Sequence, residues 1–130
     1  MVLRSANKGN VEAMYNVGVC FDDGEGVTQD KTKAFEWYLK AAENGDADAM
    51  YTVGLCYDNG EGVTQDKAEA FEWYSKAANS DHPQAVYCLA NCYYYGYGVE
   101  KDRAEASRLY QKAKQLGYAK SSSSIKCVLQ

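Results

Sequence analysis

A period of 36 residues is the feature that most constrains this chain. Residues 9–44 and 45–80 align without a gap and are identical at 24 of 36 positions, and residues 81–116 continue the register with 14 of 36 positions identical to the second copy. The flanks follow the same register, because residues 1–8 match the end of a copy and residues 117–130 match the start of one. Tandem repetition at such a period is typical of solenoids, in which each unit packs only on its neighbours. We therefore predict one solenoid domain over residues 1–130, with a trailing half-repeat, three full repeats and a C-terminal capping half-repeat.

Each copy predicts two helices joined by a turn. In the first copy, Ala13, Val17, Cys20 and Phe21 are apolar at i, i+4, i+7 and i+8, and residues 34–42 show a similar helical period. This spacing indicates amphipathic helices rather than alternating strands. Counting the two flanking half-repeats, we predict an all-α protein of about eight helices.

Local signals mark where these helices begin and end. Asp30, Asp66 and Asp102 each stand where an N-cap carboxylate can accept hydrogen bonds from first-turn amides, and a glutamate three residues after the last two predicts capping boxes. Pro83 falls near a predicted helix start, where its missing N–H costs nothing. A Gly-x-Gly-Val sequence, first seen at residues 24–27, predicts a left-handed helix end followed by a valine that packs between the two helices.

The combined pattern resembles a known repeat family. Read from Ala13 to Ala42, it is Ala-x3-Val-Gly-x2-Phe-x2-Gly-x-Gly-Val-x2-Asp-x3-Ala-x2-Trp-Tyr-x-Lys-Ala-Ala, which is similar to the Sel-1-like repeat, a relative of the tetratricopeptide repeat. The resemblance covers essentially the whole chain. It implies a right-handed α-solenoid whose first helices line a concave groove, in proteins that act as adaptors or scaffolds. The third repeat departs from the pattern at Ala90, Ser107, Leu109 and Lys114, and these changes suit a terminal unit with a polar outer face.

Composition and residue counts argue against several classes of function. The net charge of −4 argues against a nucleic-acid binder that relies on phosphate attraction. The sequence shows no apolar stretch of membrane-spanning length and no secretory signal, so we expect an intracellular, cytoplasmic protein. His82 is the single histidine, and glycines occupy alternate positions of the acidic loop at residues 22–26 where calcium ligands would be needed. We expect no enzyme activity, cofactor or metal, and a hydrolase stays a distant alternative.

The cysteines are expected to be buried thiols. Cys20, Cys56 and Cys92 recur one repeat apart, which places them at roughly the 8–10 Å of packed helices, whereas a disulfide requires Cα atoms within about 7 Å. Cys88 and Cys92 are one turn apart, but no further ligands are close enough by spacing to complete a zinc site. We therefore predict five free thiols and no bound zinc.

A set of residues on the predicted first helices remains after the core positions are removed. By similarity to tetratricopeptide repeats, these positions face the groove. They are Glu12, Tyr15, Val19, Asp22, Asp48, Tyr51, Leu55, Asp58, Gln84, Tyr87, Asn91 and Tyr94, with Tyr95 beside them. Tyr15, Tyr51 and Tyr87 would form a ladder of one ring per repeat, which predicts binding of an extended peptide or a helix. The alternative is that these tyrosines merely pack against the neighbouring repeat.

Charge is distributed unevenly among the repeats. The first two repeats carry −4 (3 basic, 7 acidic) and −5 (2 basic, 7 acidic), and the third carries +1 (5 basic, 4 acidic). The acidic part favours a protein or peptide partner with basic residues. The same asymmetry predicts weak head-to-tail self-association through the repeat ends.

The C-terminal sequence permits a second kind of function. Residues 127–130, beginning with Cys127, fit the C-a-a-X pattern for prenylation, and lysines lie upstream. The alternative reading is therefore a membrane-tethered regulatory subunit of an enzyme. Against it, Ile125, Val128 and Leu129 match the buried stripe of the second repeat, so the same segment can be a capping helix.

Overall fold

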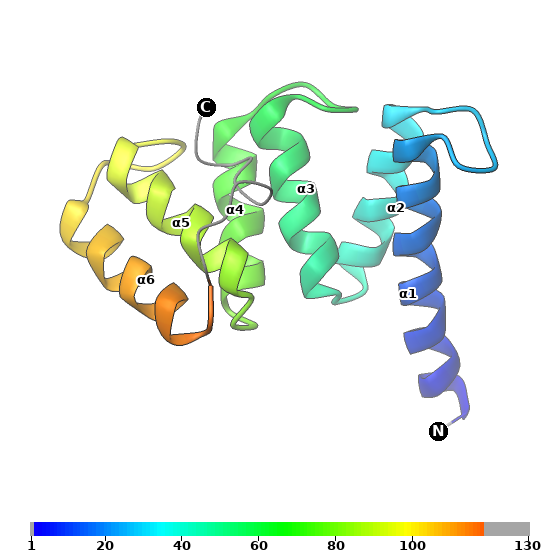
Figure 1. Ribbon diagram of the computed structural model, residues 1–130, viewed down its shortest axis with the longest axis horizontal. Helices are drawn as coiled ribbons and strands as arrows, with labels where there is room; N and C mark the ends of the chain where they lie inside the picture. The colour runs from blue at the N-terminus through cyan, green and yellow to red at the C-terminus, as the bar shows by residue number, and fades with distance from the viewer. Residues whose placement is uncertain (1, 119–130) are drawn as a thin grey trace.

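The structure, a computed structural model, is a row of helices in which each helix packs mainly on the next. It describes the backbone of residues 2–118 and the side chains of residues 10–118. The helices are α1 (Val2–Asp23), α2 (Lys31–Glu43), α3 (Ala47–Asn59), α4 (Lys67–Ala78), α5 (Pro83–Tyr95) and α6 (Arg103–Gln115), and Figure 1 shows them in that order along the long axis. The main contacts join consecutive helices. The predicted α-solenoid of helix hairpins is confirmed.

The predicted number of about eight helices differs from the six helices of the described range. The expectation treated residues 1–8 as a separate half-repeat that ends at a turn. Instead, α1 runs without a break through Gly9, whereas Gly45 at the equivalent boundary has φ +97° and turns the chain. Residues 119–130, which hold most of the predicted capping half-repeat, lie outside the described residues.

The three predicted aspartate N-caps are confirmed, but the capping boxes are replaced by another arrangement. The Asp66 carboxylate accepts from the Glu69 backbone N–H at 3.1 Å, and Asp30 and Asp102 cap their helices in the same way. The backbone N–H of Asp66 donates to the Tyr57 carbonyl oxygen at 2.8 Å, and the other two caps make the equivalent bond. The end of the first helix, rather than a glutamate side chain, therefore binds the cap N–H and closes the loop.

The Gly-x-Gly loops connect the two helices of a repeat and also pack closely against the preceding repeat. The first glycine ends the helix as predicted, since Gly60 has φ +70° and its N–H donates to the Cys56 carbonyl. The second glycine meets the preceding repeat, because a methyl group built at Gly62 would overlap the Lys31 carbonyl. Gly98 lies in the same way against Lys67. Only glycine permits this approach of one backbone to another.

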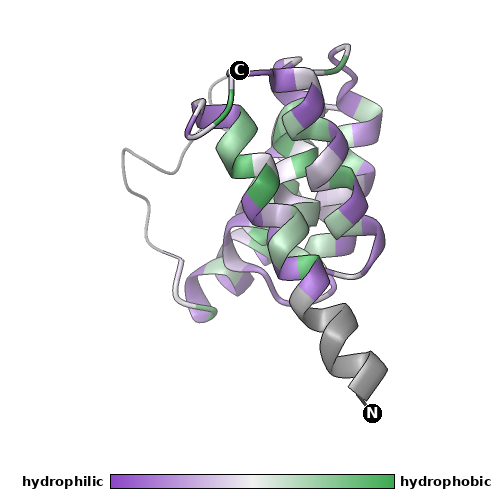
Figure 2. Ribbon diagram, turned by 90° about the vertical axis from the view of Figure 1, so that its right-hand side faces the viewer, coloured by the Kyte–Doolittle hydropathy of each residue, from purple (hydrophilic) through white to green (hydrophobic). Residues whose placement is uncertain are grey.

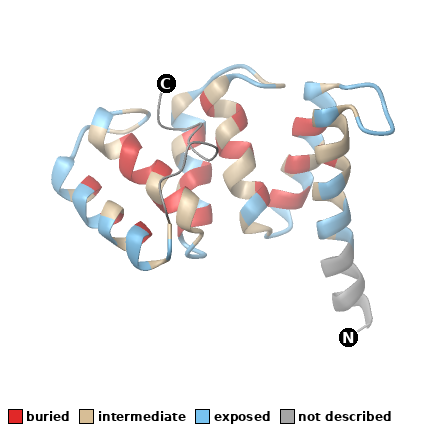
Figure 3. Ribbon diagram, viewed as in Figure 1, coloured by how far each residue is buried: buried red, intermediate tan, exposed pale blue. Residues whose placement is uncertain are grey.

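Helix glycines allow the two helices of a repeat to lie close together. A methyl group at Gly54 would lie 2.6 Å from ring carbons of Tyr74, which is fully buried, and Gly18 relates in the same way to Tyr38. The rest of the interior is built largely from small and aromatic side chains, including alanines at the helix crossings. Figure 3 shows the buried residues concentrated on the facing sides of α2 to α6. Close packing of small residues thus fixes the hairpin geometry.

The outer face of α1 is less covered than the matching faces of α3 and α5. Ala13 is exposed, whereas Ala49 at the equivalent place on α3 is buried beneath the preceding repeat. Val27 is 41% exposed, so the expectation that it packs between the helices is wrong, while Val63 packs on the core. The view from the α1 end shows apolar segments on this helix (Figure 2). No hairpin among the described residues packs on this face of α1.

Three cysteines follow the prediction of free thiols, although one of them, Cys20, is only partly buried. Cys20, Cys56 and Cys92 are free thiols, and burial raises the pKa of Cys92 to about 12. Cys88, buried on α5, is disulfide-bonded, so the prediction of five free thiols is wrong. Helix spacing excludes bridges only between cysteines one repeat or one turn apart, so the prediction did not test every pairing of Cys88.

Candidate interaction site across the first helices

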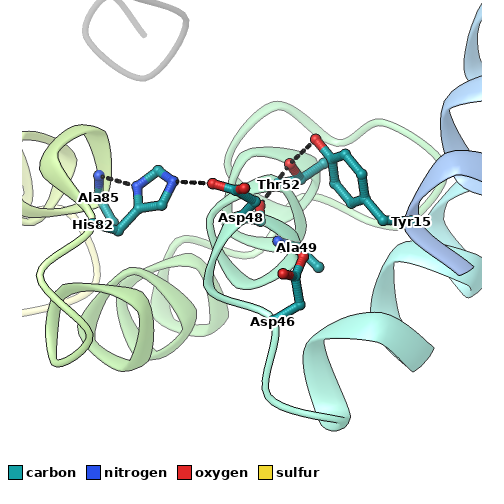
Figure 4. Close-up of polar contacts among 7 residues, drawn as sticks. All are labelled: Tyr15, Asp46, Asp48, Ala49, Thr52, His82 and Ala85. Atoms are coloured by element: carbon teal, nitrogen blue, oxygen red, sulfur yellow. Dashed lines mark hydrogen bonds and ion pairs between the residues drawn. The ribbon is translucent and has the colours of Figure 1, made fainter. Parts of the chain in front are cut away.

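A chain of polar contacts connects the three first helices. The Tyr15 hydroxyl on α1 lies 3.3 Å from Thr52 Oγ1 on α3, and the Thr52 hydroxyl donates to the Asp48 carbonyl at 2.9 Å. Asp48 Oδ1 lies 2.8 Å from His82 Nε2 at the start of α5, and His82 Nδ1 accepts from the Ala85 backbone N–H at 3.2 Å (Figure 4). Residues far apart in the sequence thus form one continuous site across successive repeats.

His82 has a structural task that the sequence analysis missed. It is the N-cap of α5, the place that Asp46 takes at the start of α3. Because Nδ1 accepts the capping hydrogen bond, the proton of the neutral ring is on Nε2, which donates to Asp48. The 36-residue register was the available signal, since it aligns His82 with a capping aspartate.

The three tyrosines of the predicted ladder are half-buried and contact the following repeat, which is the packing role that the alternative interpretation expects. Tyr15 packs on Tyr38 with ring centroids 5.3 Å apart, and Tyr51 stacks on His82 at 4.9 Å and 28°. Tyr87 occupies the equivalent place in the third repeat. Burial raises the pKa of Tyr51 to about 12 and also raises that of Tyr15, so these phenols stay neutral. Each ring therefore has a packing role, and each remains partly exposed.

Two of the predicted groove carboxylates are used inside their own repeats. Asp58 is buried, forms an ion pair with Lys67 and accepts from the Tyr74 hydroxyl at 2.9 Å. Asp22 makes the same two contacts, with Lys31 and with the Tyr38 hydroxyl, in a more exposed setting. The charge of Asp58 is therefore not free to attract a basic partner. These contacts also raise the pKa of Tyr74, chiefly through burial and then through the Asp58 charge.

The third repeat replaces this charged cluster by an aromatic one. Tyr94 stands at the aspartate position and Arg103 at the lysine position, and the guanidinium lies 4.2 Å from the Tyr94 ring centroid. Ala90 replaces the helix glycine, and the Tyr110 hydroxyl donates to Asn91 Oδ1 instead of to residue 94. Asn91 is accordingly buried, and it is not a groove residue.

The remaining predicted residues differ in accessibility. Glu12 is exposed, as is Asp48, and these carboxylates lie on α1 and α3. Val19, Leu55 and Gln84 are partly buried. Tyr95 is exposed and stacks on Tyr97 with centroids 5.4 Å apart. The accessible part of the predicted set is therefore acidic on the first two repeats and aromatic on the third.

The described side chains form no cluster suited to a metal ion, and the single histidine is used in structural contacts. Both ring nitrogens of His82 are engaged in structural hydrogen bonds, so the ring is not placed to act as a general base. Among residues with described side chains, no three His, Cys, Asp or Glu residues converge on a point that would suit a metal ion. None of the described helices has the length and apolar character required to cross a bilayer. Cys127, the candidate prenylation site, lies outside the described residues.

Comparison with known proteins identifies the repeat. The family profile described as Sel1 repeat matches residues 11–46, 47–82 and 83–118. The chain belongs to the Sel1 repeat family. The profile begins each Sel1 repeat two residues later than the boundaries read from the sequence, with the same period. Repeats of this family generally mediate protein–protein interaction. No curated protein matches the chain significantly.

Solved structures of Sel1 repeat proteins have the same fold. A Sel1 repeat protein from Oxalobacter formigenes is 36% identical with a TM-score of 0.81, covering 85% of this chain and 45% of that one. The protective antigen c5321 of uropathogenic Escherichia coli is 36% identical with a TM-score of 0.82, covering 88% and 25%. Cysteine rich protein B of Helicobacter pylori is 28% identical with a TM-score of 0.69, covering 89% of both chains. The chain thus spans less than half the length of the first two.

Proposed function

We propose that this Sel1 repeat chain is a non-enzymatic interaction module that binds an extended peptide or a helix across α1, α3 and α5. The observation that carries the proposal is the continuous polar chain from Tyr15 through Thr52 and Asp48 to His82. It links one partly accessible aromatic ring with the next, so a long ligand would meet similar chemistry at successive repeats. Tyrosine suits such contacts because its ring offers a large, rather rigid area and its hydroxyl bonds to a peptide backbone.

The charge of the exposed residues favours a basic partner. Glu12 and Asp48 are exposed on the first-helix side of repeats one and two, which together hold 14 acidic and 5 basic residues. Attraction of this kind raises the association rate and weakens as salt screens it. Asp58 is excluded from this role because its carboxylate is already paired.

The proposal can be tested with peptides selected from a random display library on the immobilised chain. Isothermal titration calorimetry then measures the affinity of each selected peptide. We expect selected peptides to be rich in Lys and Arg. Asp48→Lys should weaken their binding at least tenfold, because it reverses a charge in the centre of the site. Glu36→Lys makes the same charge change on the exposed surface of α2 and should have a small effect. Tyr51→Ala should weaken binding by about tenfold, read alongside circular dichroism because its ring also packs on Tyr74. Equal losses in the two lysine variants would refute the site.

The uncovered α1 face supports a second proposal, weak head-to-tail self-association. Ala13 and Val27 are exposed at one end, and the exposed Arg103 and Arg108 lie on α6 at the other. Sedimentation velocity should show a concentration-dependent increase in mean mass at low salt that disappears in about 0.5 M salt, where the Debye length is only a few Å. A Val27→Asp variant should remain monomeric. A wild-type chain that is strictly monomeric at high concentration and low salt would contradict this proposal.

A further inference from the structure

A pocket of about 210 Å³ opens where α6 ends. Its lining consists of Tyr87, Tyr110, Lys114 and Tyr118, so three aromatic rings from α5, α6 and the segment after α6 share the pocket with one lysine. Tyr87 and Tyr118 stack with centroids 4.5 Å apart at 20°, and Tyr87 and Tyr110 are tilted at 5.4 Å. The volume is close to that of one large apolar side chain, which suits an anchor rather than a whole ligand.

The 36-residue register explains why a pocket with this chemistry lies in the third repeat. Tyr118 stands where His82 stands one repeat earlier, and it stacks on Tyr87 as His82 stacks on Tyr51. Lys114 stands where α4 has Ala78, which is buried. The substitution of a small buried residue by a long cation, together with a tyrosine in place of the histidine, gives this junction a lining that the earlier ones do not have.

The lysine of the pocket has no counter-charge in the described part of the structure. Lys114 is exposed and forms no ion pair with any residue there, whereas Lys112 on the same helix lies 3.4 Å from the Asp81 carboxylate. The Tyr110 hydroxyl donates to Asn91, so its proton is already used. An incoming group would therefore meet three aromatic rings and a positive charge that no described residue pairs.

We infer that this pocket binds an apolar or aromatic side chain that carries a carboxylate beside it, as in an acidic peptide. The apolar part packs on Tyr87, Tyr110 and Tyr118, and the carboxylate pairs with Lys114. Taken with the proposed function, on which this one step rests, the anchor gives the ligand a direction: its basic residues lie over repeats one and two and its acidic anchor lies at repeat three.

N-acetyl-L-phenylalanine and its neutral amide are suitable probes because they differ only in the carboxylate. Titration of the full ¹⁵N-labelled chain should shift amide resonances of α5 and the end of α6, with the carboxylate form binding about two- to fivefold more tightly. Lys114→Gln should remove that difference between the probes. Lys101→Gln, which removes an exposed cation elsewhere in the third repeat, should leave it unchanged.

Several results would overturn the inference. Equal affinity of the two probes for the wild-type chain would show that Lys114 does not select a carboxylate. Shifts scattered over the chain, or none at the pocket, would show that the pocket takes no such side chain. Neither probe contains a basic residue or a peptide long enough to span repeats. Such a failure would therefore not contradict the proposed peptide site on the first helices. For the same reason, Asp48→Lys should not alter probe binding.

Discussion

Replacement of Asp58 by Asn tests whether the buried carboxylate stabilises the second repeat rather than serving a partner. The Asp58 side chain is 5% exposed and that of its partner Lys67 is 28% exposed. Removing one member of a buried pair typically costs about 3–5 kcal/mol, because the other charge is left uncompensated. Here Lys67 can regain some water, and the Asn oxygen can still accept from Tyr74. We therefore expect the free energy of unfolding to fall by about 2–3 kcal/mol.

Asp22→Asn is the matched control, because the same three side-chain types meet in the first repeat. The Asp22 and Lys31 side chains are 29% and 45% exposed, so the pair lies close to the surface regime, in which an ion pair contributes about 0–1 kcal/mol. Urea unfolding followed by circular dichroism gives both values, provided that the slope with denaturant is unchanged. Equal losses for the two variants, or a neutral Asp58→Asn, would refute the argument that burial decides the magnitude.

Two further predictions concern packing and thiol chemistry. Gly54→Ala should lower the free energy of unfolding by about 1–2 kcal/mol, since overpacking against the Tyr74 ring outweighs the better helix propensity of alanine. Urea unfolding that shows a stabilised variant would contradict this prediction. In the native chain at pH 8, Cys92 should resist alkylation by iodoacetamide because burial raises its pKa to about 12. Cys88 should be alkylated only after reduction and unfolding. Peptide mass spectrometry would detect alkylation at each residue. Rapid labelling of Cys92 would show that this part of α5 is open, and labelling of Cys88 without reductant would show that Cys88 is not disulfide-bonded.

The fold was predictable because its signals are local. The spacing of apolar residues, the caps such as Asp66 and the turn glycines act within a few residues of each other, and the 36-residue period copies them three times. The helix count failed at α1 because Gly9, at the position where Gly45 turns the chain, lies within a continuous helix. Family membership followed from the same local pattern.

The candidate site was predictable only in part, because side-chain pairing is decided by three-dimensional contacts. Asp48 and Asp58 are both on α3, yet one is exposed and the other is closed over by Lys67 and Tyr74. Sequence position alone cannot separate these two outcomes, since the lysine comes from across the loop. The role of His82 was hidden for a similar reason, because the Asp48 that binds it lies 34 residues earlier.

Because each helix contacts mainly its neighbours in the sequence, the molecule has no central nucleus that all segments share. A disturbance at α6 can reach α1 only through the repeat that lies between them, α3 and α4. Resistance to hydrogen exchange should therefore decline from α3 and α4 towards both ends, since the outer helices have a partner on one side only. A ligand lying across α1, α3 and α5 would connect hairpins that otherwise communicate only stepwise, and its binding would make the whole row unfold as a single cooperative unit.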